Sequence, residues 1–353
     1  MRLIKISEFM DQRSEDIAGI REGVEAAGER LAEIHLTAQA NQRKTEIQAA
    51  QNQSELILSI EGYQGKIEDH FSRVERDEQS KRSANCIRIE LTRITEKLKE
   101  KILQWLQTTD PSSNHNRACT SHKPGTGDWF TKGQSYRTWL AKPNSFFWLN
   151  GKAGCGKTVL SSTIIENTIL HCDENEGCVM AYFYFSFTDS AKQKSENMLS
   201  SLLAQLSSQV DITPNTLVSL HRTYERSTPP IDPLKSCIQT LMDELPFFNV
   251  YLIVDAIDEM PSPDGREEAC KVLQELSQNP KAHVLMTSRR EHDITEYISE
   301  CNNVTDISIQ NPEVDHDIQL YIRQRLKEDK KLNRWAALHS EIEDLLGRKA
   351  DGM

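Results

Sequence analysis

The chain has 353 residues, which is more than one hydrophobic core usually takes, so we expect two domains. Its formal net charge of −11 argues against non-specific nucleic-acid binding, and we expect no nucleic-acid partner. No apolar run is long enough to span a bilayer, and the first residues lack the apolar stretch of a secretory signal. The eight cysteines are scattered without a C-x-x-C pair, which favours reduced thiols and a cytoplasmic location.

Residues 1–107 have the character of an all-α region, with no proline between Asp16 and Leu106. Apolar residues follow a three–four spacing typical of a heptad seam at Ile17, Ile20, Val24, Ala27, Leu31, Ile34 and Ala38. The seam loses its apolar character over residues 41–52 and returns in two later runs, residues 57–74 and 87–105. One interpretation is an intramolecular helical bundle. The other is a coiled coil through which several chains self-associate.

Residues 108–127 are rich in Pro, Ser, Asn and Gly, so we interpret them as a linker or irregular lead-in. His115, Cys119 and His122 raise the question of a metal site. Because neither a fourth ligand nor a paired spacing is present, we interpret them as ordinary loop residues.

The strongest motif follows the apolar run Phe146–Leu149 and precedes a helical pattern from Val159 to Leu170. It has the form G-x-x-x-x-G-K-[ST], in which glycines let backbone N–H groups face a phosphate at a helix N-terminus. The predicted cofactor-binding residues are Gly151, Lys152, Ala153, Gly154, Cys155, Gly156, Lys157, Thr158 and Val159. We expect Lys157 to reach the β and γ phosphates of ATP or ADP and the Thr158 hydroxyl to ligate Mg²⁺.

Acidic residues follow a second apolar run, Tyr251–Val254, which we interpret as a buried parallel strand. Asp255 ends that strand, beside the phosphate loop, and is predicted to hold the Mg²⁺ shell. Asp258 and Glu259 come one short turn later and could orient a water that attacks the γ-phosphate. The alternative is that they form an acidic helix N-terminus.

A third apolar run, His283–Met286, leads into Thr287 and then Arg289. Arg289 is predicted to sense the terminal phosphate by a bidentate contact, the alternative being a solvent-facing loop arginine. Strands are expected at residues 146–150, 179–187, 250–255 and 282–287, with a fifth at the edge near 304–309. Helical segments separate them, so we expect a parallel α/β sheet with right-handed crossovers over residues 128–353.

The segments FFWLNGKAGCGKTVLSS, YLIVDAIDE and VLMTSRRE, in this order, resemble the NACHT-type P-loop domain of the STAND signalling NTPases. More narrowly they are similar to its fungal members with a nephrocystin-like core. A strand between the P-loop and Asp255, and an acid after Asp255, fit the additional-strand, catalytic-glutamate branch of these NTPases. The resemblance implies a small helical lobe over residues 315–326 and 332–346, and it places Thr126 and Gly127 near an adenine base. It also implies that the chain ends before a winged-helix module and repeats.

By this resemblance, the chain is expected to be an NLR-like switch that binds ATP or ADP and hydrolyses it slowly. The alternative is an oligomerising helical scaffold whose nucleotide site is structural or degenerate. A metabolic kinase is a poor third, because the sequence offers no sign of an acceptor pocket.

Overall fold

The computed structural model describes residues 78–107, 109–210, 213–244, 249–310 and 312–349. The chain divides into two units, residues 1–92 and 93–353. The helix α2 (Glu78–Leu106) enters the second unit, where Ile102 and Leu106 are buried in its core. The heptad seam from Ile17 to Ala38 and the run over residues 57–74 lie outside the described residues.

The centre of the second unit is a five-stranded sheet in the order β2-β3-β4-β1-β5, in which every pair of neighbours is parallel. Its strands are β1 (Ser145–Asn150), β2 (Cys178–Tyr184), β3 (Asn249–Asp255), β4 (Ala282–Ser288) and β5 (Val304–Ser308). The strand that intervenes in sequence between the P-loop and Asp255 is β2, at one edge of the sheet, and β4 lies between β1 and β3. The predicted parallel α/β fold is therefore confirmed.

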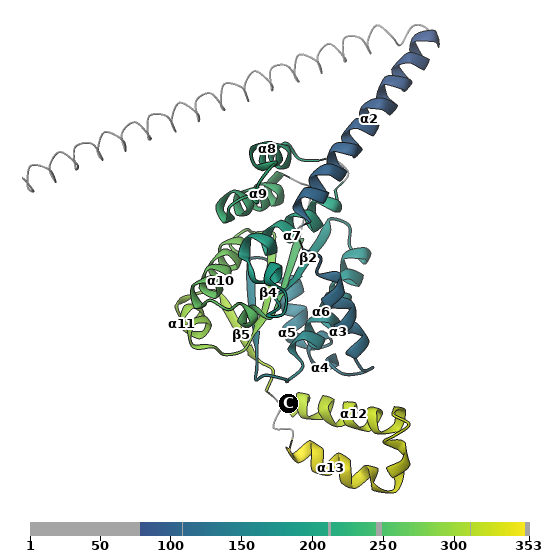
Figure 1. Cartoon of the computed structure of the whole chain (residues 1–353), viewed down its shortest axis with the longest axis vertical. Coiled ribbons are helices and arrows are strands. Elements are labelled where there is room, and N and C mark those ends of the chain that lie inside the picture. The colour runs from purple at the N-terminus through teal and green to yellow at the C-terminus, as the bar shows by residue number, and fades with distance from the viewer. Residues whose placement is uncertain (1–77, 108, 211–212, 245–248, 311, 350–353) are drawn as a thin grey trace, which may run out of the picture. The chain divides into compact units, whose positions relative to one another are not determined.

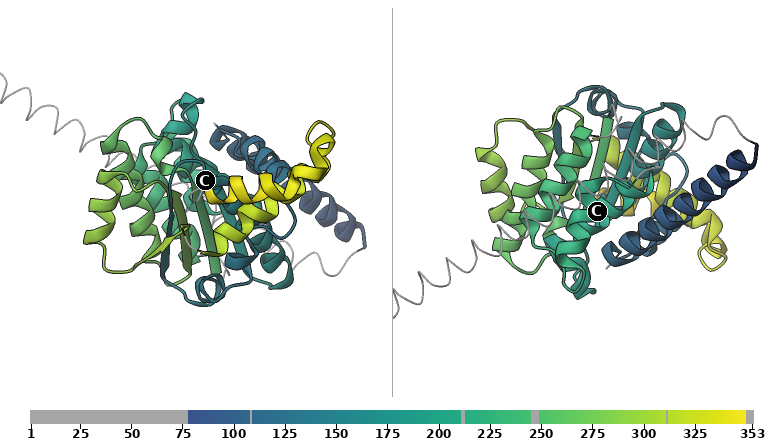
Figure 2. Two further views of the ribbon diagram at one scale, coloured as in Figure 1. Left: turned by 90° about the horizontal axis from the view of Figure 1, so that it is seen from below. Right: turned by 90° about the horizontal axis from the view of Figure 1, so that it is seen from above.

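Helices cover both faces of the sheet, as the views in Figure 1 and Figure 2 show. Successive residues of β1 point to opposite faces. Phe146 and Trp148 pack with the core beneath α7 (Ser195–Ser208), α9 (Ile231–Glu244) and α10 (Pro263–Ser277). Phe147 and Leu149 pack with the core beneath α5 (Gln134–Ala141) and α6 (Lys157–Glu174). The α-helices after α2 are α3 (Ser112–Ser121), α4 (Asp128–Thr131), α5 (Gln134–Ala141), α6 (Lys157–Glu174), α7 (Ser195–Ser208), α8 (Asn215–Tyr224), α9 (Ile231–Glu244), α10 (Pro263–Ser277), α11 (His292–Glu300), α12 (Pro312–Glu328) and α13 (His339–Lys349). Short 3₁₀ turns occupy Ser190–Gln193, Ile257–Glu259 and Asn333–Leu338. Within the described ranges, none of the helices has both the length and the apolar content that crossing a bilayer demands.

The lead-in segment is more ordered than the sequence suggests, because α3 occupies much of it. The carboxylate of Asp110 accepts the backbone N–H of Ser112 at 2.8 Å and so satisfies an N–H group at the start of the helix. His115 and Ala118 are buried against the rest of the domain. The interpretation of this stretch as irregular chain is therefore wrong for α3.

The helical lobe expected after the sheet is present as α12 and α13. The two helices pack together and are joined by an ion pair between Arg323 and Glu343, whose Nη2 and Oε1 atoms are 2.5 Å apart. The inner side of α12 contacts the lead-in segment, since the carboxylate of Asp317 accepts the backbone N–H of Gly127 at 2.6 Å.

Candidate nucleotide site

The loop between β1 and α6 has the backbone of a phosphate cradle. Gly154 and Gly156 adopt φ angles of 78° and 86°, in the left-handed region that favours glycine. A Cβ at either position would meet nothing within 4 Å, so the backbone conformation, rather than crowding, requires glycine there. At Gly151, by contrast, a Cβ would lie 2.7 Å from the sulfur of Cys155. The loop therefore curls tightly into the N-terminus of α6, where backbone N–H groups favour an anion.

Lys157 is the first residue of α6, and its ammonium folds back over this loop. Its Nζ atom donates to the carbonyl oxygens of Gly151 and Lys152, both at 2.8 Å. The side chain is thus held at the rim of the cradle, where a phosphate would exchange with these carbonyls.

Asp255 ends β3 and is buried, with its side chain beside α6 and β4. Its Oδ1 atom accepts hydrogen bonds from the hydroxyls of Ser161 and Thr287, both at 2.6 Å. Burial raises the pKa of this carboxyl, and hydrogen bonds from Ser161, Thr287 and Thr158 act in the opposite direction. The structure therefore brings together Asp255 and Thr158, whose carboxylate and hydroxyl oxygens are ligands that Mg²⁺ accepts.

The three predicted catalytic residues lie at the ends of β3 and β4, and they differ in their surroundings. Both oxygens of Asp258 are engaged by Arg289: Oδ1 accepts the backbone N–H at 3.0 Å and Oδ2 pairs with Nε at 3.0 Å. The side chain of Asp258 is 4% exposed and that of Arg289 is 47% exposed. Arg289 is therefore an exposed residue after β4 that is nevertheless ion-paired, and a phosphate would compete with Asp258 for it.

Glu259 is less constrained than Asp258, because one of its oxygens accepts a single backbone hydrogen bond, from Phe187 at 3.0 Å. Burial raises the pKa of this carboxyl, and the nearby carboxylates of Asp258 and Asp255 raise it further. A half-buried acid with a raised pKa, close to Asp255 at the end of β3, has the properties of a general base. Among the two predicted acids, Glu259 is the better placed for that role.

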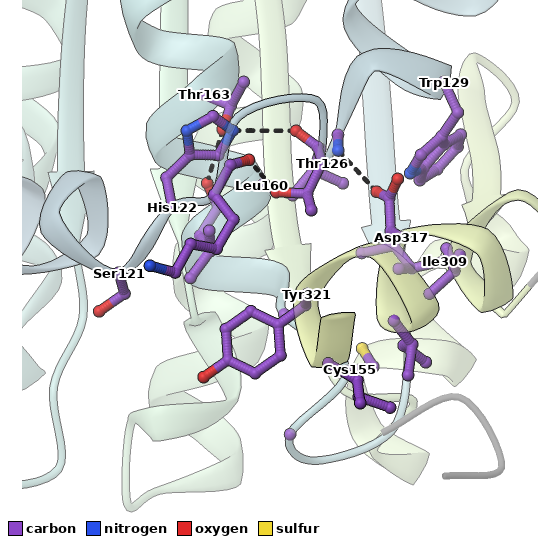
Figure 3. Close-up of a pocket in the computed structure, with 18 of the residues that line it drawn as sticks. Ser121, His122, Thr126, Trp129, Cys155, Leu160, Thr163, Ile309, Asp317 and Tyr321 are labelled. Carbon is purple, nitrogen blue, oxygen red and sulfur yellow. Dashed lines mark hydrogen bonds between the residues drawn. The ribbon is translucent and has the colours of Figure 1, made fainter. Parts of the chain in front are cut away.

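A pocket of about 560 Å³ opens beside the loop, between α6, the lead-in segment and α12. Figure 3 shows Tyr321 of α12 across from Leu160 and Thr163, and Asp317 of the same helix beside Thr126 and Trp129. Other residues of its lining are His122, Gly127, Trp129, Gly154, Cys155, Gly156, Val159, Ile309, Val314 and Ile318. The lining is largely apolar with a few polar groups, which is the usual make-up of a small-molecule site.

The sequence predicted part of this pocket and missed the rest. Thr126 and Gly127, which the resemblance places near an adenine base, line it. Asp317 and Tyr321 were not predicted as site residues, because the α12 sequence does not show which of its faces meets the pocket. His122 also lines the pocket, and its Nε2 atom is 2.9 Å from the carbonyl oxygen of Thr126.

One family model matches the part of the chain that carries the motif. The family model described as nephrocystin 3, N-terminal, matches residues 125–289, which include the phosphate loop, Asp255 and Arg289. No curated protein matches the chain.

Among solved structures, the chain is similar to one in the Drosophila ORC bound to DNA, with 12% identity and a TM-score of 0.37. This match covers 66% of the present chain and only 57% of the Drosophila chain. A Walker-type ATPase of Pyrococcus abyssi has 11% identity and a TM-score of 0.39, with 64% of each chain covered. Domain III of the replication initiation protein DnaA from Thermotoga maritima has 16% identity and a TM-score of 0.30, with 59% and 72% covered.

Proposed function

We propose that this protein binds ATP or ADP with Mg²⁺, hydrolyses ATP slowly, and uses the bound nucleotide as a signalling switch of the STAND, NLR-like type. One observation carries the proposal: the pocket beside the phosphate loop is also lined by α12. A nucleotide whose phosphates lie on residues 151–158 would have its base in that pocket. It would then contact the sheet domain and the helical lobe at the same time.

The roles of the residues follow from their positions. Lys157 supplies positive charge to the β and γ phosphates once it leaves the loop carbonyls. Thr158 and Asp255 hold Mg²⁺, which neutralises charge on the phosphate oxygens when bound. Glu259 orients the attacking water, and Arg289 contacts the terminal phosphate when it separates from Asp258.

A switch requires that ATP and ADP bind two states of the protein differently. The two nucleotides differ only at the γ-phosphate, which would lie near the Asp258–Arg289 ion pair rather than in the base pocket. We infer that this ion pair is where the two nucleotides are distinguished. The contact between Asp317 and Gly127 would then carry the difference to the helical lobe.

The proposal is tested by denaturing the purified chain and identifying any released nucleotide by mass spectrometry, followed by calorimetric titration with ADP and ATP. We expect bound or bindable adenine nucleotide in the wild type. A Thr163→Phe substitution places a larger side chain in the pocket and should abolish nucleotide binding. The control is Thr223→Phe, on the exposed face of α8 and outside the pocket lining, which should bind normally. An empty site that takes up neither nucleotide would contradict the proposal and favour the helical scaffold.

A further inference from the structure

Three side chains with metal-binding atoms meet between α3 and α6. His115 and Cys119 are one turn apart on α3, so they lie on the same face of that helix. Glu166 reaches them from α6. One ligand atom from each side chain lies within 4.8 Å of the other two.

One distance within this cluster is close to the separation that a zinc ion requires, and the other two ligand atoms must adjust. With Zn–N and Zn–S bonds at their usual lengths, the two ligand atoms of a tetrahedral site are about 3.6 Å apart. The Nε2 atom of His115 and the sulfur of Cys119 are 3.5 Å apart, but the same sulfur is 4.0 Å from Nδ1, so it must rotate toward Nε2 to share an ion with it. Glu166 is closer than a metal would allow, since its Oε1 atom is 2.7 Å from the same nitrogen. The Glu166 side chain is 56% exposed, so it can withdraw by the small distance needed.

The orientation of His115 is set independently of the other two side chains. Its Nδ1 atom is 3.0 Å from the hydroxyl of Tyr184, and its side chain is 8% exposed. The ring also contacts that of Tyr182, with centroids 5.0 Å apart. Metal-binding histidines are usually fixed by a hydrogen bond through the nitrogen that does not bind the metal. The contact with Tyr184 leaves Nε2 facing Glu166, whereas the sulfur of Cys119 lies beside the ring, at similar distances from both of its nitrogens.

We propose that the protein binds one Zn²⁺ ion through His115 Nε2, Cys119 Sγ and Glu166 Oε1. The mixed nitrogen, sulfur and oxygen donor set suits Zn²⁺, whereas Mg²⁺ takes oxygen ligands. Three protein ligands leave the fourth tetrahedral position to water. On binding, the thiol of Cys119 loses its proton to solvent and the thiolate becomes the ligand. The ion would tie α3 to α6, the helix that begins at Lys157, and so would stabilise the lead-in segment against the nucleotide domain.

The two α3 ligands were present in the sequence as H-x-x-x-C, but the third was not recognisable there. Glu166 follows Cys119 by many residues and belongs to a different helix, so only the fold brings it near. His122, considered with them in the sequence, instead contacts the carbonyl of Thr126. The interpretation of His115 and Cys119 as loop residues is wrong, because both belong to α3.

The test uses the full chain after treatment with a chelator. Nucleotide is left out and Mg²⁺ is in excess, so that Zn²⁺ binding at the phosphate loop does not contribute to the signal. Zn²⁺ is titrated by calorimetry, and Co²⁺ is titrated by absorption, in which a thiolate ligand gives a charge-transfer band. We expect one ion per chain and a band that Cys119→Ser removes. The matched control Cys172→Ser, on α6 and outside the cluster, should keep the band.

A second variant keeps the test informative if Cys119→Ser disturbs folding. Glu166 is exposed, so Glu166→Gln should retain the wild-type circular dichroism. Its Kd for Zn²⁺ should rise more than about tenfold, because losing a residue that only supports a metal ligand already costs that much and Glu166 is itself a proposed ligand. Its control, Glu174→Gln near the end of the same helix, should bind as the wild type does. Absence of stoichiometric Zn²⁺ binding, a band that survives Cys119→Ser, or an unchanged Kd in Glu166→Gln would overturn the proposal. These results do not depend on nucleotide binding, so they do not test the proposed switch.

Discussion

Replacing Lys157 by alanine is the most direct perturbation of the phosphate site. Truncating one partner of a buried charge pair costs about 2–5 kcal/mol. In the structure the ammonium already donates to two loop carbonyls at 2.8 Å, and it must give up these hydrogen bonds to reach a phosphate. The net loss should therefore fall in the lower part of that range, about 2–3 kcal/mol, which is about a 30- to 140-fold rise in Kd.

The assay is calorimetric titration of ADP in the presence of Mg²⁺, with circular dichroism to show that each variant is folded. Lys142→Ala is the matched control, because that lysine is exposed at the end of α5 and outside the pocket lining. The control should bind ADP as the wild type does. If Lys157→Ala has the same Kd as the wild type, the assignment of this loop as the phosphate cradle is refuted.

Three further changes test other parts of the account. Because burial raises the pKa of Asp255 above its usual 3.8, its ionised form opposes folding once the pH rises through that pKa. Asp255→Asn should therefore raise Tm at pH 7 in scanning calorimetry and weaken Mg²⁺-dependent nucleotide binding, and a lower Tm would contradict the burial argument. Glu259→Gln should slow single-turnover ATP hydrolysis by about 10²–10⁴-fold. Since the pKa of Glu259 is raised, the wild-type rate should fall on the acid side at a pH above 4.5, and a rate that is flat down to that pH would exclude Glu259 as the base. If the heptad seam is intermolecular, residues 1–106 should sediment as a helical oligomer that Ile20→Asp with Leu31→Asp returns to monomer, whereas a monomeric wild-type fragment would favour the bundle.

The sheet was predictable because burial of a strand on both faces produces a short apolar run that can be recognised in the sequence. Residues 250–254 of β3 form an uninterrupted apolar run, as in a strand buried on both faces, and the strand was expected at residues 250–255 and found at Asn249–Asp255. The phosphate loop was equally predictable, since the left-handed conformations at Gly154 and Gly156 favour glycine, which the motif contains at both positions.

The features that were missed depend on contacts between distant parts of the chain. α3 has little apolar periodicity, and its order depends on His115 and Ala118 being buried against the folded domain. Asp317 becomes a pocket residue only because α12 packs beside Gly127, far earlier in the sequence. The pairing of Asp258 with Arg289 was likewise not visible, because it needs the ends of β3 and β4 to come together.

The central claim is that nucleotide in the pocket controls the helical lobe, and hydrogen exchange of α12 tests it most directly. Amide exchange would be followed by mass spectrometry in the empty chain, with Mg²⁺ and ADP, and with Mg²⁺ and a non-hydrolysable ATP analogue. The account predicts that both nucleotides protect the phosphate loop, that protection of α12 differs between them, and that α9, which does not line the pocket, is unchanged. Identical exchange of α12 in the two nucleotides, with the phosphate loop protected in both, would contradict the switch.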